Sequence, residues 1–202
     1  MGRAVLSKLN ELRFEESGHL YLLNGKEIPS VSSIMRPLSM IEYGGIDKTI
    51  LETAAKRGTS VHNSIEIFLK YGVRDYDPEF AGYADGFFEW WDNNSPEVVG
   101  SEFRVYHKLF SYAGTVDMLA YIDGKLCLID FKTTYKLILK NCRVQLEAYL
   151  QALKTHGIEI ERKFILHLCK DGKWEFVECP AKDPDALRVF MSCKSVYDYI
   201  QS

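Results

Sequence analysis

The fold is decided by the stretch Gly114-Thr115-Val116-Asp117-Met118-Leu119-Ala120-Tyr121-Ile122-Asp123-Gly124-Lys125-Leu126-Cys127-Leu128-Ile129-Asp130-Phe131-Lys132-Thr133. Two apolar runs flank Asp123-Gly124, and an Asp-Gly pair between such runs is a strong signal for a two-residue hairpin turn. The sequence therefore predicts two antiparallel strands, over about 114–122 and 125–133.

This hairpin brings two carboxylates together. If Ile122 faces Lys125, the same register pairs Asp117 with Asp130, and Lys132 follows on the same face. Directly opposed like charges destabilise a sheet, so two carboxylates with Cβ atoms roughly 5 Å apart need a proton or a cation between them. A hard divalent metal ion held by carboxylate oxygens meets that need.

A surface ion pair is the ordinary alternative, because many hairpins carry exposed Asp and Lys. Residues 126–129 form an unbroken apolar run, which is typical of a strand buried on both faces. A carboxylate at the end of such a strand favours a functional site.

Further motifs precede and follow the hairpin. Residues 57–66 read Arg-Gly-Thr-Ser-Val-His-Asn-Ser-Ile-Glu, which places His62 and Glu66 four apart on one helix face. Glu102 stands in the strand before the hairpin, and Gln145 and Tyr149 are again four apart on a later helix. Residues 19–31 form an N-terminal hairpin pattern around Asn24-Gly25.

Together these motifs resemble the PD-(D/E)XK nuclease superfamily, in its RecB-like exonuclease branch. The N-terminal hairpin is similar to that of phage-encoded, stand-alone members, and the mitochondrial genome maintenance exonuclease is similar around Asp130-Phe131-Lys132. The resemblance covers most of residues 19–150. The "PD" of the motif is Val116-Asp117 here, as is usual in this branch. The fold implied is α/β and restriction-endonuclease-like, with a mixed central sheet flanked by helices.

The resemblance also implies roles for individual residues. Asp117 and Asp130 would hold one or two Mg²⁺ or Mn²⁺ ions, with His62 and the Phe131 carbonyl as further ligands, while Lys132 would position or deprotonate the attacking water. Glu102 and Glu66 are candidate catalytic acids. The remaining candidates contact DNA or support the ligands: Gln145, Tyr149, Arg57, Thr133, Lys136, Lys140 and Arg143.

Ordinary structural roles compete with several of these assignments. His62 could be a histidine at the edge of the core, Glu66 a helix-surface residue and Glu102 a solvent-facing strand residue. Gln145 and Tyr149 also fit a plain amphipathic helix. The aromatic residues at 87–91 could stack unpaired bases, but aromatic residues at helical spacing are more often core, and only Trp90 and Trp91 are left open.

The net charge of −3 argues at first against nucleic acid as a partner. The distribution of charge matters more than its sum. From Lys132 to Arg143 the chain carries four basic residues and no acidic one. This run is a candidate phosphate-contacting edge, and its alternative is a solvated helix face.

Composition sets the remaining limits. The chain has 202 residues, 47% of them hydrophobic and 13% aromatic, as expected for one globular domain. No apolar run approaches the roughly 20 residues of a membrane span, and residues 1–16 lack a signal-peptide pattern. We therefore expect a protein of the cytoplasm of a bacterial or phage-infected cell, with no membrane partner.

The cysteines and the phosphate-binding motifs limit the cofactors. None of the five cysteines forms a Cys-x-x-Cys pair. Family members with an iron–sulfur cluster use one N-terminal cysteine, and no cysteine precedes Cys127 here. We expect no iron–sulfur cluster, and without a P-loop motif no nucleotide cofactor.

The sequence predicts one domain over 1–202, with a catalytic core over about 47–180. Its expected elements are a hairpin at 19–35, a helix at 47–71 broken near Arg57-Gly58, a helix at 78–93, strands at 98–107, 114–122 and 125–133, a helix at 138–155, a hairpin of 161–169 with 173–179, and a helix over about 184–202.

The resulting expectation is a metal-dependent DNA exonuclease that acts on ends or single strands during replication, repair or recombination, with partner proteins from those processes. Three alternatives stay open: a structure-specific endonuclease of the same superfamily, a catalytically inactive nucleic-acid-binding module, and a sheet protein unrelated to nucleases.

Overall fold

A computed structural model describes residue 9 and residues 11–201; residues 1–8, 10 and 202 lie outside the described part, and with them the ends of the predicted domain. The helices and strands, in chain order, are β1 (Leu12–Glu15), β2 (Leu20–Leu23), β3 (Lys26–Ile28), α1 (Val31–Ile34), α2 (Arg36–Tyr43), α3 (Lys48–Tyr71), α4 (Ala81–Asn94), β4 (Glu97–Tyr106), β5 (Ala113–Ile122), β6 (Lys125–Lys132), α5 (Leu139–Thr155), β7 (Arg162–Leu168), β8 (Trp174–Cys179) and α6 (Pro184–Gln201).

The molecule is built around a mixed five-stranded sheet in the order β4-β5-β6-β7-β8. Only β6 and β7 run parallel, and α5 makes the crossover between them. A second, three-stranded sheet of β1, β2 and β3 packs at the β4–β5 end through Tyr21, Ile28 and Tyr106. This arrangement confirms the predicted α/β class with a mixed central sheet.

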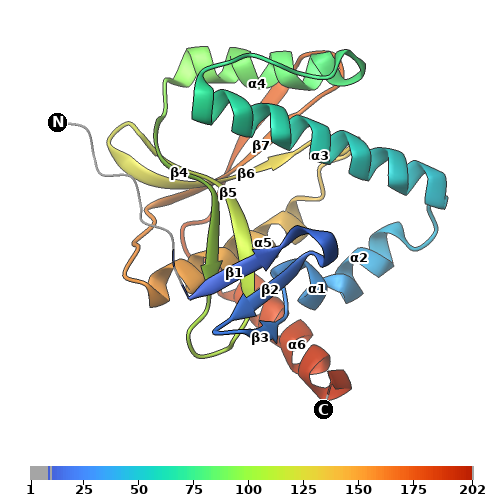
Figure 1. Ribbon diagram of the computed structural model, residues 1–202, viewed down its shortest axis with the longest axis vertical. Helices are drawn as coiled ribbons and strands as arrows, with labels where there is room; N and C mark the ends of the chain where they lie inside the picture. The colour runs from blue at the N-terminus through green and yellow to red at the C-terminus, as the bar shows by residue number, and fades with distance from the viewer. Residues whose placement is uncertain (1–8, 10, 202) are drawn as a thin grey trace.

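Helices cover both faces of the large sheet (Figure 1). One hydrophobic cluster joins α3 and α4 to alternate residues of β6 such as Cys127 and Ile129. The other joins α1, α5 and α6 to the intervening residues Leu126 and Leu128. Residues 126–129 are thus buried on both faces, as their apolar run predicts.

The hairpin turn forms as predicted. Asp123 and Gly124 have φ angles of 51° and 77°, the left-handed pair that a tight hairpin requires. The resulting register runs from Ile122 opposite Lys125 to Met118 opposite Ile129.

The aromatic residues of α4 belong to the core. Phe87 and Trp90 are fully buried, and Trp91 packs edge-on against Phe68 with ring centroids 5.0 Å apart. Trp90 is therefore a core residue, and Trp91 is a half-buried residue that packs against the same cluster.

The predicted break near Gly58 is wrong, because α3 runs without interruption. Asp47 caps its first turn through the Thr49 N–H, and Gly72 ends it in the left-handed conformation. One glycine inside a helix costs only about 1 kcal/mol, which the packing of a 24-residue helix outweighs.

The predicted hairpin at 19–35 is right for β2 and β3, and it is wrong for the residues that follow Ser30. Residues 31–34 form α1, because the Ser30 side chain accepts the Ser33 N–H and begins a helix. Neither β1 nor α2 follows from the sequence pattern. Among the described helices, none is both long and apolar enough to cross a membrane.

Candidate active site

The strands β5 and β6 separate where the two predicted carboxylates stand. Their pairing ends at Met118 opposite Ile129, so Asp117 and Asp130 are not a ladder pair. The Phe131 N–H instead donates to Asp117 Oδ2 at 2.6 Å. The predicted direct opposition is therefore wrong in detail, because Asp117 takes over a backbone donor that a continuing ladder would use.

A local distortion accompanies this separation. Val116 and Leu119 both belong to the cluster beneath α5 although they are three residues apart, so β5 loses its regular alternation at Asp117. In the neighbouring strand, Ser101 pairs with Met118 and Phe103 with Val116, which leaves Glu102 across from Asp117. The two carboxylates that the sheet opposes are Glu102 and Asp117.

Glu102 adopts a strained backbone conformation, with a φ of 46°. A left-handed residue inside a strand costs on the order of 1–3 kcal/mol, and such strain gathers at functional sites. The distortion turns Glu102 away from the regular, solvent-facing strand position that is the ordinary alternative for it.

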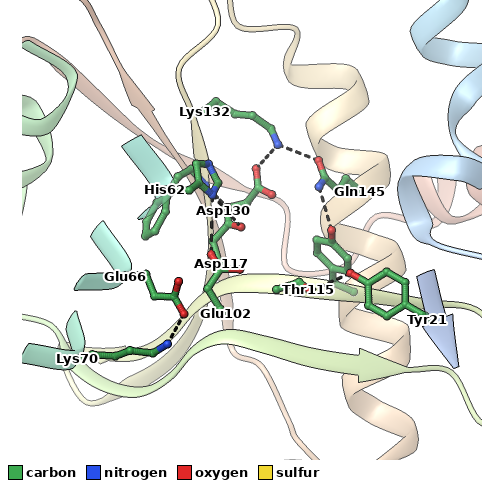
Figure 2. A network of polar contacts seen from close by, with 12 residues as sticks. Tyr21, His62, Glu66, Lys70, Glu102, Thr115, Asp117, Asp130, Lys132 and Gln145 are labelled. Atoms are coloured by element: carbon green, nitrogen blue, oxygen red, sulfur yellow. Dashed lines mark hydrogen bonds and ion pairs between the residues drawn. The ribbon is translucent and has the colours of Figure 1, made fainter. Parts of the chain in front are cut away.

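His62 completes a cluster with these two acids (Figure 2). Its Nδ1 lies 3.6 Å from Asp117 Oδ1 and 3.9 Å from Glu102 Oε1. Burial alone would lower the pKa of His62, but the Asp117 and Glu102 carboxylates raise that pKa to about 9. Its ring also meets the Phe131 ring edge-on at 5.8 Å, which fixes its orientation.

The donor set of this cluster fits a divalent cation. One nitrogen or oxygen from each of His62, Glu102 and Asp117 lies within 4.8 Å of the others. Carboxylate oxygens suit Mg²⁺ and Mn²⁺, and an imidazole nitrogen also suits Zn²⁺ and other transition-metal ions. Glu102 thus stands with the metal-ligand candidates, where the sequence predicted a catalytic acid.

Asp130 and Lys132 form the second half of the site. Asp130 is 2% exposed, and its Oδ2 has the Lys132 ammonium at 2.7 Å but accepts no well-directed hydrogen bond. Burial raises the pKa of Asp130 to about 6 against the opposing effect of Lys132. Burial would lower the pKa of Lys132, but Asp130 and Asp117 raise it, so the lysine stays cationic.

The helix α5 holds this lysine from the other side. The Lys132 ammonium donates to Gln145 Oε1 at 2.9 Å (Figure 2). Gln145 Nε2 in turn donates to the Tyr149 hydroxyl at 3.1 Å. The i, i+4 spacing of Gln145 and Tyr149 therefore serves a relay that orients Lys132, as the sequence predicted for supporting residues.

The remaining predicted residues lie beside the site, on the surface or in ion pairs of their own. Thr133 is buried beside the site, and its Oγ1 lies 3.8 Å from the position that a Cβ added to Gly58 would take. Lys136 and Lys140 are exposed. Glu66 is bound to Lys70, and Arg143 donates to Asp183 at 2.6 Å. Arg143 is therefore engaged in an ion pair of the fold.

The structure adds a residue that sequence reasoning missed. Tyr43, at the end of α2, lines a cleft of about 210 Å³ together with Lys132 and Gln145; we call it the lysine cleft. Only Pro37 early in α2 signals that helix in the sequence.

Comparisons with known proteins assign no family. No family model matches the chain, and no curated protein matches it. A solved structure described as the crystal structure of SSO0001 aligns with a TM-score of 0.38 and 15% identity, over 73% of this chain and 75% of that one. A likeness this weak assigns neither fold family nor function.

Proposed function

We propose that this protein is a metal-dependent DNA nuclease of the PD-(D/E)XK type, acting as an exonuclease. The observation that carries the proposal is the meeting of a candidate cation-binding cluster, His62 with Glu102 and Asp117, and the ion pair of buried Asp130 with half-buried Lys132 at the point where β5 and β6 separate. The sequence motifs that resemble the RecB-like branch supply the same residues.

Each residue has a role in this proposal. His62, Glu102 and Asp117 would hold Mg²⁺ or Mn²⁺, and Asp130 with the Phe131 carbonyl stay predicted as further ligands. A divalent ion so held polarises a scissile phosphate and lowers the pKa of a bound water.

In this proposal Lys132 supplies positive charge and does not act as a base. A lysine whose pKa is raised holds its proton, so it donates to the phosphate oxygens and stabilises negative charge that develops there. Gln145 fixes where that charge lies, because it accepts one of the three ammonium hydrogens. Asp130 neutralises the lysine until the substrate phosphate arrives.

The test compares end-labelled linear single-stranded DNA with a closed circle of the same sequence. Each is incubated with Mg²⁺, Mn²⁺ or EDTA, using the unchanged chain and Lys132→Ala. We expect metal-dependent loss of the linear strand alone, and none with Lys132→Ala. Wild-type cutting by Lys132→Ala would refute the proposal.

The other outcomes select the alternatives. Cleavage of the circle would indicate an endonuclease, and binding without cleavage of either substrate would indicate an inactive binding module.

The proposal implies a reducing cell interior such as the cytoplasm, where the five free thiols would persist.

A further inference from the structure

A second, larger cleft lies beside the candidate site. It has a volume of about 490 Å³ and lies between α2, the start of α3 and the segment that follows β6. We call it the apolar cleft; the residues that matter here are Tyr43, Ile46, Ile50, Arg57, Tyr135 and Lys136.

The apolar cleft continues into the lysine cleft. Tyr43, Thr134 and Ile138 line both of them. A strand whose phosphate lies at Lys132 therefore has its neighbouring nucleotide within reach of the apolar cleft. The two spaces can be occupied by one ligand.

The surface of the apolar cleft offers rings and aliphatic side chains to solvent. Tyr135 is 102% exposed and Ile50 is 61% exposed, with Ile46 beside them. Single exposed apolar residues need no explanation, but a group of them rimming a cleft marks a binding site. An aromatic ring that nothing covers can stack on the face of a nucleobase.

The charges around the apolar cleft favour an anion. Within residues 11–201, Arg57 has neither a hydrogen bond nor an ion pair, and its Nε is buried; its guanidinium lies over the Tyr83 ring, 5.4 Å from the centroid. Lys136 is exposed at the rim. The acidic residue of the lining, Glu42, accepts a hydrogen bond from Asn141 at 2.6 Å. The Arg57 guanidinium packs on the Tyr83 ring and has no anionic partner in the described part of the chain, so it can donate to a phosphate.

We propose that the apolar cleft binds an unpaired terminal nucleotide of single-stranded DNA, with its base stacked on Tyr135 and its phosphate on Arg57. This inference rests on the proposed nuclease function and specifies its substrate. A base inside a duplex has both faces covered by its neighbours, and the last pair of a blunt duplex has one open face but each of its bases stays hydrogen-bonded to its complement. An unpaired base can enter the apolar cleft and stack on Tyr135 without breaking a base pair. The chain therefore prefers single-stranded ends to blunt duplex ends.

The test measures binding by fluorescence anisotropy, with the full chain carrying Lys132→Ala and Mg²⁺ present. The probes are an internally labelled single-stranded oligonucleotide, the same strand with abasic residues at its terminal positions, and the blunt duplex. We expect the intact single strand to bind more tightly than the other two. In the same background, Tyr135→Ala should weaken its binding by about 5- to 150-fold, the loss of one stacked base.

Matched variants separate stacking from general damage. Tyr135→Phe keeps the ring and should restore most of the affinity, whereas Tyr71→Ala removes an exposed tyrosine from the far end of α3 and should change nothing. The abasic strand should bind equally well with and without Tyr135→Ala, because it has no base to stack.

Several results would overturn the inference: equal affinity for the intact and abasic strands, equal affinity for single strand and blunt duplex, or undiminished binding by Tyr135→Ala. Tighter binding of RNA than of DNA of the same sequence would overturn the choice of DNA. Failure here is distinct from failure of the nuclease proposal, because cleavage by the unchanged chain is read separately on a gel.

Discussion

Gly114 is the residue whose replacement tests the relay most directly. A Cβ added at this position of β5 would lie 2.4 Å from Cε1 of Tyr149, far inside contact distance. Tyr149 is buried, so its ring cannot rotate out into solvent and has to shift within the core. Overpacking of this kind costs about 1–3 kcal/mol, and we expect Gly114→Ala to lower the free energy of unfolding by that amount.

The same displacement should reach the candidate site. Moving Tyr149 breaks its hydrogen bond with Gln145, which in turn orients Lys132. A misplacement of about 1 Å at a reacting group can cost roughly 100-fold in rate. Gly114→Ala should therefore lose nuclease activity at temperatures where it is still folded.

Urea unfolding followed by circular dichroism measures the first effect, and a cleavage assay measures the second. Gly100→Ala is the control, since a Cβ there meets nothing closer than Phe103 at 3.5 Å. In a Tyr149→Leu background the added methyl group should cost less, as a double-mutant cycle would show. Gly114→Ala with an unchanged urea midpoint would refute the packing argument.

Three further outcomes are expected. Lys163 and Glu147 form a buried ion pair, with 1% and 3% exposure. Lys163→Met should destabilise the fold by about 3–5 kcal/mol, because it leaves the buried Glu147 carboxylate without its cation. Urea midpoints measure this loss, and replacing Glu147 as well should recover much of it. Because the pKa of His62 is raised to about 9 and a ligand imidazole must be neutral, Mn²⁺ affinity measured calorimetrically should rise with pH up to about 9; a flat profile between neutral pH and 9 would exclude His62 as a ligand. The hydrogen bond from Arg143 lowers the pKa of Asp183, so this pair stabilises the fold at pH values above the ordinary carboxyl pKa and stops doing so as pH falls through the lowered pKa of Asp183. Arg143→Gln should therefore cost about 1 kcal/mol or less near pH 7 and nothing in strong acid. An equal loss of stability at both pH values would contradict the role of this ion pair.

The sequence by itself determined the elements whose signals are local. The turn at Asp123-Gly124 requires left-handed backbone angles, which fixes the register of β5 on β6 from Ile122 to Met118. The spacing of Gln145 and Tyr149 likewise needs only the helix repeat. These features depend on neighbours within a few residues, so pattern and turn chemistry suffice to predict them.

Tertiary structure alone decided how the site is assembled. The separation of β5 from β6 lets Asp117 accept the Phe131 N–H, and the strained backbone of Glu102 brings that acid to His62. Regular strand geometry, extended from the turn, paired Asp117 with Asp130, and it left a solvent-facing strand position open as the alternative for Glu102. Tyr43 joins the cleft because α2 packs beside α5, a contact between segments about a hundred residues apart in which Glu42 meets Asn141. Such contacts depend on long-range packing, and no local signal in the sequence records them.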